Sequence, residues 1–271
     1  MRFVFKVCIL LTVVLAGTSA TAQRALKPSP LYQNGWFQGP PEAYLRLGVG
    51  AGSFGISDGK WAPPGAPPNG SDPIVFFDLS EPDNAVGTIA IGRKVRQNMR
   101  GEIALTHFGR EDISGPWSYT VPSSLGPHAS VSTTFQSTAL MANVFYDLPK
   151  MGRGDFRVQP YIMGGLGVAW NKMGDWTRIN TDKPQPTRTF EGDTNSDFAF
   201  ALGVGAGWTV GKSKAGPITL DVMYQFFDLG SAKGSSTVLS GGQGDAPVDP
   251  LSFDVTSHVI SFGVRIPLNL R

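Results

Sequence analysis

The sequence predicts an all-β protein that folds as an eight-stranded antiparallel up-and-down transmembrane β-barrel. Eight segments alternate apolar residues with small or polar ones, which is the period of a β-strand with one apolar face. The connections between these segments alternate strictly between long and short, as in barrels with long external loops and short periplasmic turns. The composition agrees, because the 271 residues include 34 Gly and 21 Pro and only 16% of them are charged.

The clearest strand–turn–strand unit is Val144–Trp170. Its two β-patterned runs are joined by a tight connection that contains Pro149, Gly152 and Gly154. Such a unit leaves two unpaired strand edges, which the hydrocarbon of a bilayer does not tolerate. The rest of the chain is therefore expected to supply the strands that close the barrel.

The first 22 residues have the three regions of a secretory signal peptide. Arg2 and Lys6 form the positive region, Val7–Leu15 is the apolar region, and Ala20-Thr21-Ala22 has the small-x-small form of a cleavage site. Cleavage between Ala22 and Gln23 is expected. The alternative, a membrane-anchoring helix, is disfavoured because the apolar run is too short to span a bilayer.

Removal of this segment changes what the mature chain can do. It takes away Cys8, the single cysteine, so we expect no disulfide and no cysteine metal ligand. Without Arg2 and Lys6 the count of Lys and Arg falls from 23 to 21 and equals the 21 Asp and Glu. A formally neutral chain offers no bulk charge for binding nucleic acid.

Residues 23–41 are read as a periplasmic N-terminal tail, and residues 42–271 as the outer-membrane barrel. The eight predicted strands are Glu42–Ile56, Asn84–Val95, Gly101–Gly109, Val131–Asp147, Phe156–Asn171, Asn195–Val210, Pro217–Leu229 and Ser252–Leu268. The four long loops expected outside the cell are Ser57–Asp83, Glu111–Ser130, Lys172–Thr194 and Gly230–Leu251. Pro63-Pro64 and Pro67-Pro68 support the first loop, because proline cannot sit inside a sheet.

Each predicted strand has one apolar parity. In the first four strands it includes Leu45, Leu47, Val49, Ile89, Ile91, Ile103, Leu105 and Val144. In the last four it includes Ile162, Leu166, Val168, Phe198, Leu202, Val204, Leu220, Val222, Ile260 and Phe262. The opposite parity is Gly, Ala, Thr and Gln with isolated charges, which suits a narrow lumen better than a water-facing surface. The apolar parity is therefore expected to face lipid, and a soluble ligand-binding barrel of the lipocalin type is the alternative.

Aromatic residues lie towards the ends of several predicted strands. Those expected to form interfacial girdles are Tyr146, Trp170, Trp208 and Tyr224. The hexapeptide Leu-Gly-Val-Gly-Ala-Gly occurs at Leu47–Gly52 and again at Leu202–Gly207. A phosphate-binding loop is disfavoured because no helix follows either copy. Glycine on the inner face instead allows strongly tilted strands to approach in a narrow barrel.

Seven charged residues on the inner parity are predicted to form a network in the lumen: Arg46, Lys94, Glu102, Asp147, Arg157, Asp221 and Arg265. Buried charges need partners. Lys94 is expected to neighbour Glu102, Asp147 to neighbour Arg157, and Asp221 to neighbour Arg265. A paired network that fills the lumen is favoured, and a path for protons or ions is the alternative.

Other chemistry is poorly supported. The three histidines, His107, His128 and His258, have no metal-ligand spacing. His128-Ala129-Ser130 has the His-x-Ser order found in lipid A deacylases, but no glutamate partner can be placed. Asp193, Asn195 and Asp197 resemble the start of a calcium loop, although its glycine and distal glutamate are missing. No catalytic, metal or cofactor site is predicted.

Four segments together resemble the small outer-membrane β-barrel family of Gram-negative bacteria, which includes opacity-like surface proteins and OmpA-like transmembrane domains. They begin at Asn143, Asp197, Ile218 and His258 and read NVFYDLPKMGRGDFRVQPYIMGGLGVAW, DFAFALGVGAGW, ITLDVMYQFFDLG and HVISFGVRIPL. The resemblance covers about Glu42 to Leu268. Members commonly end in an aromatic residue that the barrel-assembly machinery reads, whereas this chain ends in Asn269-Leu270-Arg271.

The resemblance implies a bacterial outer-membrane protein, without enzymatic activity, that has a structural or surface-interaction role and a lumen filled by side chains. Expected partners are outer-membrane lipid and lipopolysaccharide, the barrel-assembly machinery, and a host or cell-surface ligand bound by the loops. The chain is expected to be monomeric and to bind no nucleic acid. A narrow channel is the alternative function, followed by an enzyme that modifies lipid A.

Overall fold

A computed structural model describes residues 42–62, 74–121, 129–153, 157–180, 187–241, 247 and 249–269. The predicted signal peptide, its cleavage site at Ala22 and Gln23, and the tail 23–41 lie outside the described residues. The chain divides into a unit of residues 1–39 and a unit of residues 40–271, and the second contains the whole sheet.

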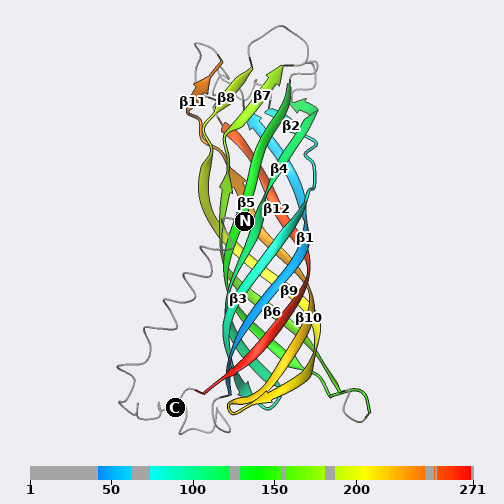
Figure 1. Cartoon of the computed structure of the whole chain (residues 1–271). Helices are drawn as coiled ribbons and strands as arrows, with labels where there is room; N and C mark the ends of the chain where they lie inside the picture. Colours follow the sequence, from blue (N-terminus) through cyan, green and yellow to red (C-terminus); the bar gives the residue numbers. More distant parts are fainter. Residues whose placement is uncertain are drawn as a thin grey trace, which may run out of the picture. The chain divides into compact units, whose positions relative to one another are not determined.

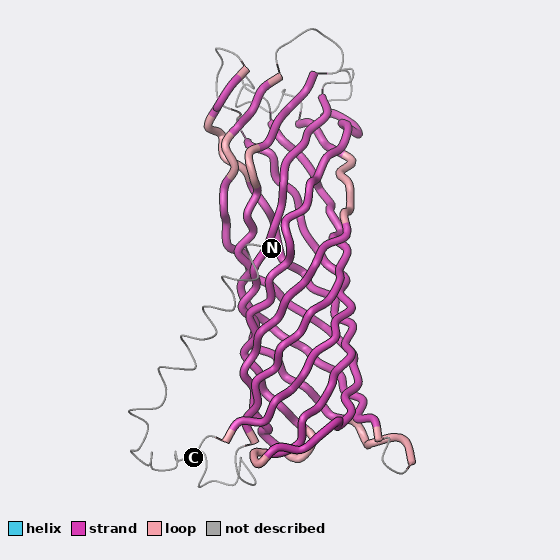
Figure 2. The backbone as a smooth tube through the Cα atoms, viewed as in Figure 1, coloured by secondary structure: helices cyan, strands magenta, loops and turns pink. Residues whose placement is uncertain are grey.

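Eight strands of this unit close into a ring. They are β1 (Ala43–Ala62), β3 (Asp83–Arg96), β4 (Met99–Val121), β5 (Ala129–Asp147), β6 (Val158–Met173), β9 (Asp193–Ser213), β10 (Gly216–Lys233) and β12 (Asp249–Leu268). Each pairs antiparallel with the next, and β12 pairs with β1 to complete the circle (Figures 1 and 2). The predicted eight-stranded up-and-down barrel is confirmed. No helix in the described part of the chain has the length and apolarity needed to cross a membrane.

The strands are strongly staggered around the ring. The line of paired residues that leaves β1 at Ala43 returns to β1 at Ser53, ten residues farther along. Such a shear in an eight-stranded barrel corresponds to a strand tilt of about 35–45° and to an interior just wide enough for side chains to fill. The stagger decides which inward side chains can meet, because partners lie at different heights along their strands.

The structure corrects the predicted loops. Ordered strands continue where irregular chain was expected: β1 runs to Ala62 and β4 runs to Val121, well past its predicted end at Gly109. Four short strands extend the sheet at the same end of the barrel (Figure 1): β2 (Ile74–Phe77), β7 (Trp176–Asn180), β8 (Arg188–Phe190) and β11 (Val238–Ser240). We call the four short strands, together with the adjoining ends of the long strands, the extension.

The extension is ordered because its inner parity is apolar while much of its outer parity is polar. On β4, Ile113 is buried between the outward Asp112 and Ser114. On β12, Phe253 is buried beside the outward Asp254. This is the pattern of a strand with one face in a core. These strands were not predicted, because the predicted strands were those with an apolar parity facing lipid. In the extension the apolar parity faces the inside.

The remainder of the barrel carries an apolar outer belt. Val49 is 70% exposed, Leu166 60%, Leu202 58% and Phe262 61%. An apolar band of this kind around a closed barrel is the surface that a transmembrane barrel presents to lipid. The soluble-barrel alternative is wrong, since it would place these side chains inside.

Candidate functional site

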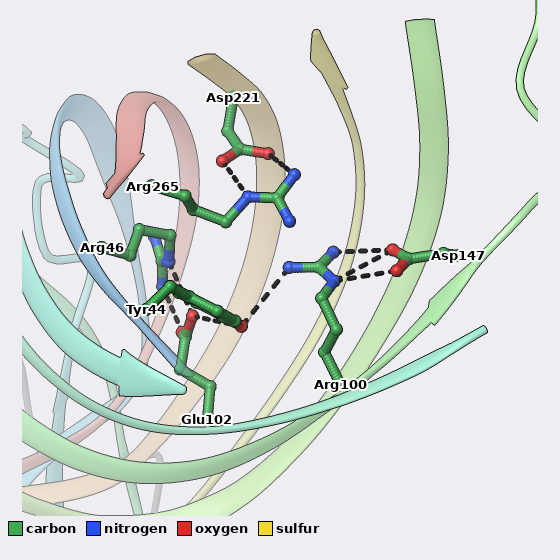
Figure 3. Close-up of polar contacts among 7 residues, drawn as sticks. All are labelled: Tyr44, Arg46, Arg100, Glu102, Asp147, Asp221 and Arg265. Carbon is green, nitrogen blue, oxygen red and sulfur yellow. Dashed lines mark hydrogen bonds and ion pairs between the residues drawn. The ribbon is translucent and has the colours of Figure 1, made fainter. Parts of the chain in front are cut away.

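Seven inward side chains form a polar cluster near the end of the barrel that carries the short turns (Figure 3). We call them the charge cluster: Tyr44, Arg46, Arg100, Glu102, Asp147, Asp221 and Arg265. They come from β1, β4, β5, β10 and β12 and point into the lumen. Three guanidinium groups face three carboxylates, so the cluster can be neutral as a whole.

Arg46 and Glu102 form the most buried pair of the cluster. The Nη2 atom of Arg46 donates to Oε1 of Glu102 at 2.6 Å, and its Nε donates to Oε2 at 3.0 Å. Their side chains are 4% and 0% exposed. The hydroxyl of Tyr44 also donates to Glu102, at 3.3 Å. Two parallel N–H donors to one carboxylate give the strong bidentate geometry of arginine.

Arg100 holds Asp147 and joins it to the rest of the cluster. Its Nε lies 3.0 Å from both carboxylate oxygens, and its Nη2 donates to Oδ1 at 2.8 Å. Its Nη1 donates to the hydroxyl of Tyr44 at 3.4 Å. The guanidinium group also lies 4.5 Å from the ring centre of Phe145 and 4.9 Å from that of Tyr161. Cation–π contact therefore adds to the ion pair.

Asp221 and Arg265 form the third pair, as the sequence predicted from their adjacent strands. Nε of Arg265 donates to Oδ2 at 2.7 Å, and Nη2 donates to Oδ1 at 3.0 Å. The Asp221 side chain is 3% exposed and the Arg265 side chain 13%. Because both charges leave water, the pair is stable only when both partners are present.

Two other predicted pairs are wrong. Lys94 contacts Glu42 at 3.5 Å instead of Glu102, and both side chains are well exposed at the rim of the barrel. Arg157 is exposed and precedes β6, and Asp147 pairs with Arg100 instead. Lys94 and Arg157 have inward parity, but parity alone does not bring a residue into the cluster: Arg100, which pairs with Lys94 across β3 and β4, is buried there.

The sequence pattern did not predict the partners of Glu102 and Asp147. Glu102 was paired with Lys94 instead of Arg46, and Arg100, the partner of Asp147, was left out of the network. Arg100 was assigned to a turn because the third strand was predicted to begin at Gly101. A signal was present, however, since Arg100 lies two positions before Glu102 and therefore shares its parity. Tyr44 carried the same signal, since it lies two positions before Arg46, but its role as a bridge depends on β1 and β4, which are distant in the sequence.

Glycines on the inner face leave the space that the cluster occupies. A Cβ atom on Gly207 would lie 2.5 Å from Nη2 of Arg265 and 2.8 Å from Oδ1 of Asp221. A Cβ atom on Gly205 would lie 2.6 Å from the Tyr161 ring. The repeated glycines of the sequence thus make room for large side chains, in addition to the close strand approach that was predicted.

Above the cluster the lumen becomes first neutral and polar, and then apolar. Thr88 and Thr106 share a hydrogen bond of 3.1 Å, and Asn143, Gln225 and Ser261 are buried nearby on the inner face. A continuous apolar core follows and extends into the extension. Its largest members are Trp61, Trp176, Phe54, Phe108, Phe135, Phe190, Phe227 and Phe253.

Aromatic packing closes the core at the far end. Trp176 stacks on Phe190 with ring centres 4.1 Å apart, and it meets Trp61 edge-on at 5.7 Å. The guanidinium group of Arg178 lies 5.3 Å from the Trp61 ring centre. Burial here, together with the nearby positive charge of Arg188, lowers the pKa of Arg178. The lumen is therefore occupied by side chains from the charge cluster to this aromatic group.

Asparagine and aspartate side chains close a seam between β9 and β10. Regular pairing of these strands stops at Asp228 and Phe200, where β10 bulges at Gly230 with a φ of 71°. Beyond this point Asn195 donates to the carbonyl of Ser231 at 2.7 Å, and Asp197 accepts from its amide at 3.0 Å.

Asn171 of β6, which pairs with Asn195, is fully buried and reaches the same part of β10. It donates to the carbonyls of Leu229 at 2.7 Å and Ser231 at 2.9 Å. Asn195 and Asp197, which resembled a calcium loop, thus replace missing strand pairing. No group of His, Cys, Asp or Glu that could hold a metal was found among the described residues. His128 of the His-x-Ser motif lies outside them.

The four predicted interfacial aromatics all face outward, at different places. Tyr146 and Trp208 lie near the short turns, and Trp170 lies towards the extension, opposite Ser196. Tyr224 pairs with Val204 and Ile260 in the belt. Its hydroxyl shares a hydrogen bond of 2.7 Å with Nδ1 of His258, so a side chain satisfies it instead of interfacial water.

Among known proteins, the comparisons found similar solved structures. No protein-family model matches the chain, and no curated protein matches it. Neisserial surface protein A is 12% identical, with 85% of this chain and 100% of that chain covered and a TM-score of 0.46. The attachment invasion locus protein Ail of Yersinia pestis is 11% identical, with 83% and 99% covered and a TM-score of 0.38. The outer membrane protein OprG of Pseudomonas aeruginosa is 14% identical, with 85% and 99% covered and a TM-score of 0.38.

These likenesses are too distant to carry a function. The closed ring and the apolar belt are properties of this chain itself, and they give it the architecture of a small outer-membrane β-barrel.

Proposed function

We propose that the protein is a monomeric outer-membrane barrel of a Gram-negative bacterium with a structural and surface-interaction role and a closed lumen. The observation that supports this role is the continuous filling of the lumen. The charge cluster occupies one end, and the apolar core occupies the other. If the filled lumen conducts no ions and holds no catalytic site, the function depends on the outer surfaces of the barrel.

Opening such a lumen would be costly. A path through the charge cluster would have to separate buried ion pairs, and removing one partner of such a pair typically costs about 3–5 kcal/mol. The path would then have to cross the aromatic core, whose largest side chains are fully buried. The filled lumen therefore argues against the narrow-channel alternative.

The extension provides the surface for interaction. It shares the continuous apolar core of the barrel and presents several apolar side chains beyond the belt. Phe76 and Tyr119 stack with ring centres 4.3 Å apart, and Tyr119 is 52% exposed beside Ile74 at 40%. Exposed aromatic side chains are common anchors of binding interfaces. We expect the host or cell-surface ligand to bind here, while lipid and lipopolysaccharide surround the belt.

Conductance in a planar bilayer tests the closed lumen. The refolded full chain should give no steady current. The double variant Arg46→Ala with Glu102→Ala should also give none, because the aromatic core remains. Discrete and reproducible current steps from the wild-type protein would replace this proposal with the channel. Lipid A from a deletion strain should have an unchanged mass, since altered acylation would indicate the enzyme.

A complementation assay tests the surface role. A deletion strain should lose adhesion or detergent resistance, and the wild-type gene should restore it. The variant Ile74→Ser with Tyr119→Ser should fail to restore adhesion, while Asp112→Ser on the same β4 strand should succeed. Equal restoration by both variants would remove the extension from the function.

Epitope tags test the proposed orientation. Tags near Pro64, Leu125, Lys183 and Gly242, whose structure lies outside the described residues, should be accessible on intact cells. A tag in the turn at Lys150–Gly154 should be hidden until the outer membrane is permeabilised. The reverse result would invert the orientation.

A further inference from the structure

The short-turn end of the barrel carries exposed positive charge. Five exposed cations lie on two turns, and we call them the basic rim: Lys150, Arg153, Arg157, Lys212 and Lys214. None of the five forms an ion pair with another described residue. At this end the described carboxylates are those of the charge cluster and Glu42, which already contacts Lys94. Asp155, in the first of the two turns, lies outside the described residues.

The opposite end has the opposite sign. Exposed acidic residues of the extension and its adjoining strand ends are Asp58, Asp78, Glu81, Asp83, Asp112, Asp175, Glu191, Asp193, Asp249 and Asp254. Exposed cations there are Lys60, Arg110, Lys172 and Lys233. The formally neutral mature chain is therefore polarised along the barrel axis, and an anionic surface would be attracted at the short-turn end alone.

The basic rim also lies at the level of lipid headgroups. Tyr146 on β5 precedes Lys150 by four positions, and Trp208 on β9 precedes Lys212 by four positions. Both aromatics face outward at the edge of the belt, where such rings sit among headgroups. Four residues of strand span about 13 Å, and the tilt shortens this along the membrane normal. Lysine and arginine side chains can extend back over the remaining distance to the phosphates.

We infer that the basic rim binds the phosphate groups of anionic phospholipids in the adjacent leaflet. The inference rests on the proposed membrane insertion but not on the proposed surface role. The five cations are spread over two turns, so several headgroups can be bound at once. Each contact joins one side-chain cation to one phosphate. The exposed Met151, 60% accessible between Lys150 and Arg153, can insert beside the acyl chains. Preferential anionic lipid on this side would fix the depth and tilt of the barrel.

Native mass spectrometry of the full chain in zwitterionic detergent tests the inference. Phosphatidylglycerol and phosphatidylcholine with identical acyl chains are added in equal amounts, and the lipids retained per protein are counted. The wild-type protein should retain phosphatidylglycerol preferentially, by about fivefold for each cation–headgroup contact at low salt. The preference should fall as ionic strength rises.

Two variants with equal charge change locate the effect. Lys150→Gln, Arg153→Gln, Lys212→Gln and Lys214→Gln together should reduce the ratio of the two retained lipids to no more than the preference of about fivefold that the remaining Arg157 supplies. The matched control, Lys60→Gln, Arg110→Gln, Lys172→Gln and Lys233→Gln, should keep the wild-type ratio. All eight positions are exposed, so both variants should refold, and circular dichroism verifies that they do.

Several outcomes would overturn the inference. They are equal retention of the two lipids by the wild-type protein, an unchanged ratio in the rim variant, or the same loss in the control. Rim-dependent sedimentation with purified peptidoglycan without any lipid preference would assign the rim to the cell wall instead. None of these results bears on adhesion, so a failure here is distinguishable from a failure of the surface role.

Discussion

Arg46 on β1 and Glu102 on β4 meet across the intervening strand β3, with Nη2 and Oε1 2.6 Å apart. Gly92 on β3 leaves the room: it lies opposite Glu102 in one strand pair and opposite Tyr44 in the other. A Cβ atom at Gly92 would overlap the ring of Tyr44. The position of the Tyr44 ring, whose hydroxyl bonds to this ion pair, therefore depends on a residue without a side chain in a third strand.

Glu102→Ala should destabilise the barrel strongly. It leaves the guanidinium group of Arg46, which is 4% exposed, without its carboxylate, and such stranding typically costs about 3–5 kcal/mol. Urea unfolding in lipid vesicles measures the loss. Glu42→Ala serves as the control, because its contact with Lys94 is exposed and should contribute less than about 1 kcal/mol. An equal or larger loss in Glu42→Ala would show that the buried Arg46–Glu102 pair does not stabilise the barrel more than an exposed pair does.

Asp221→Ala and Arg265→Ala should be non-additive. Each single change strands a mostly buried charge, whereas the double change strands none. The double variant should therefore lose less unfolding free energy than the sum of the single losses. A thermodynamic cycle from the four unfolding curves gives the difference. Strict additivity would mean that each charge is solvated separately, as in a wet pore.

Gly92→Ala should destabilise the barrel by overpacking, at a cost of about 1–3 kcal/mol. The new methyl group would meet the Tyr44 ring, whose hydroxyl bridges Glu102 and Arg100. Gly87→Ala is a matched control on the same strand, since a Cβ atom there meets nothing within 4 Å. Heat-dependent mobility shift of the folded barrel compares the two variants. Equal shifts would show that Gly92 is not needed for space.

Leu202→Arg should cost about 2–4 kcal/mol in lipid, because it puts a charge on the belt near mid-membrane. Val222→Arg should cost less, because Val222 pairs with Ala206, two residues from Trp208 at the edge of the belt. Ser240→Arg on β11 should cost little, since Ser240 is exposed in the extension. Refolding yield into lipid vesicles measures all three. Similar yields for the three variants would argue that the belt does not face lipid.

The sequence alone was sufficient for the parts of the fold that repeat at short range. Alternation at Leu202, Val204 and their neighbours predicted the outward parity, and the order of long and short connections predicted eight strands. Asp221 and Arg265 were also predictable as neighbours, because parity puts both on the inner face of strands that follow one another around the barrel. Each of these inferences needs information from at most two adjoining segments.

Other features were decided by the tertiary structure. Arg46 reaches Glu102 because the shear of the closed ring sets their heights on either side of β3, where Gly92 leaves room for the Tyr44 ring. The extension is ordered because apolar inner residues such as Ile113 and Phe253 find one another across the lumen. Asn171 and Asn195 close the seam by bonding to Ser231 and Lys233, which lie 60 and 38 positions later in the chain. A period of two assigns a face to each residue, but closure of the ring decides which residues on that face meet.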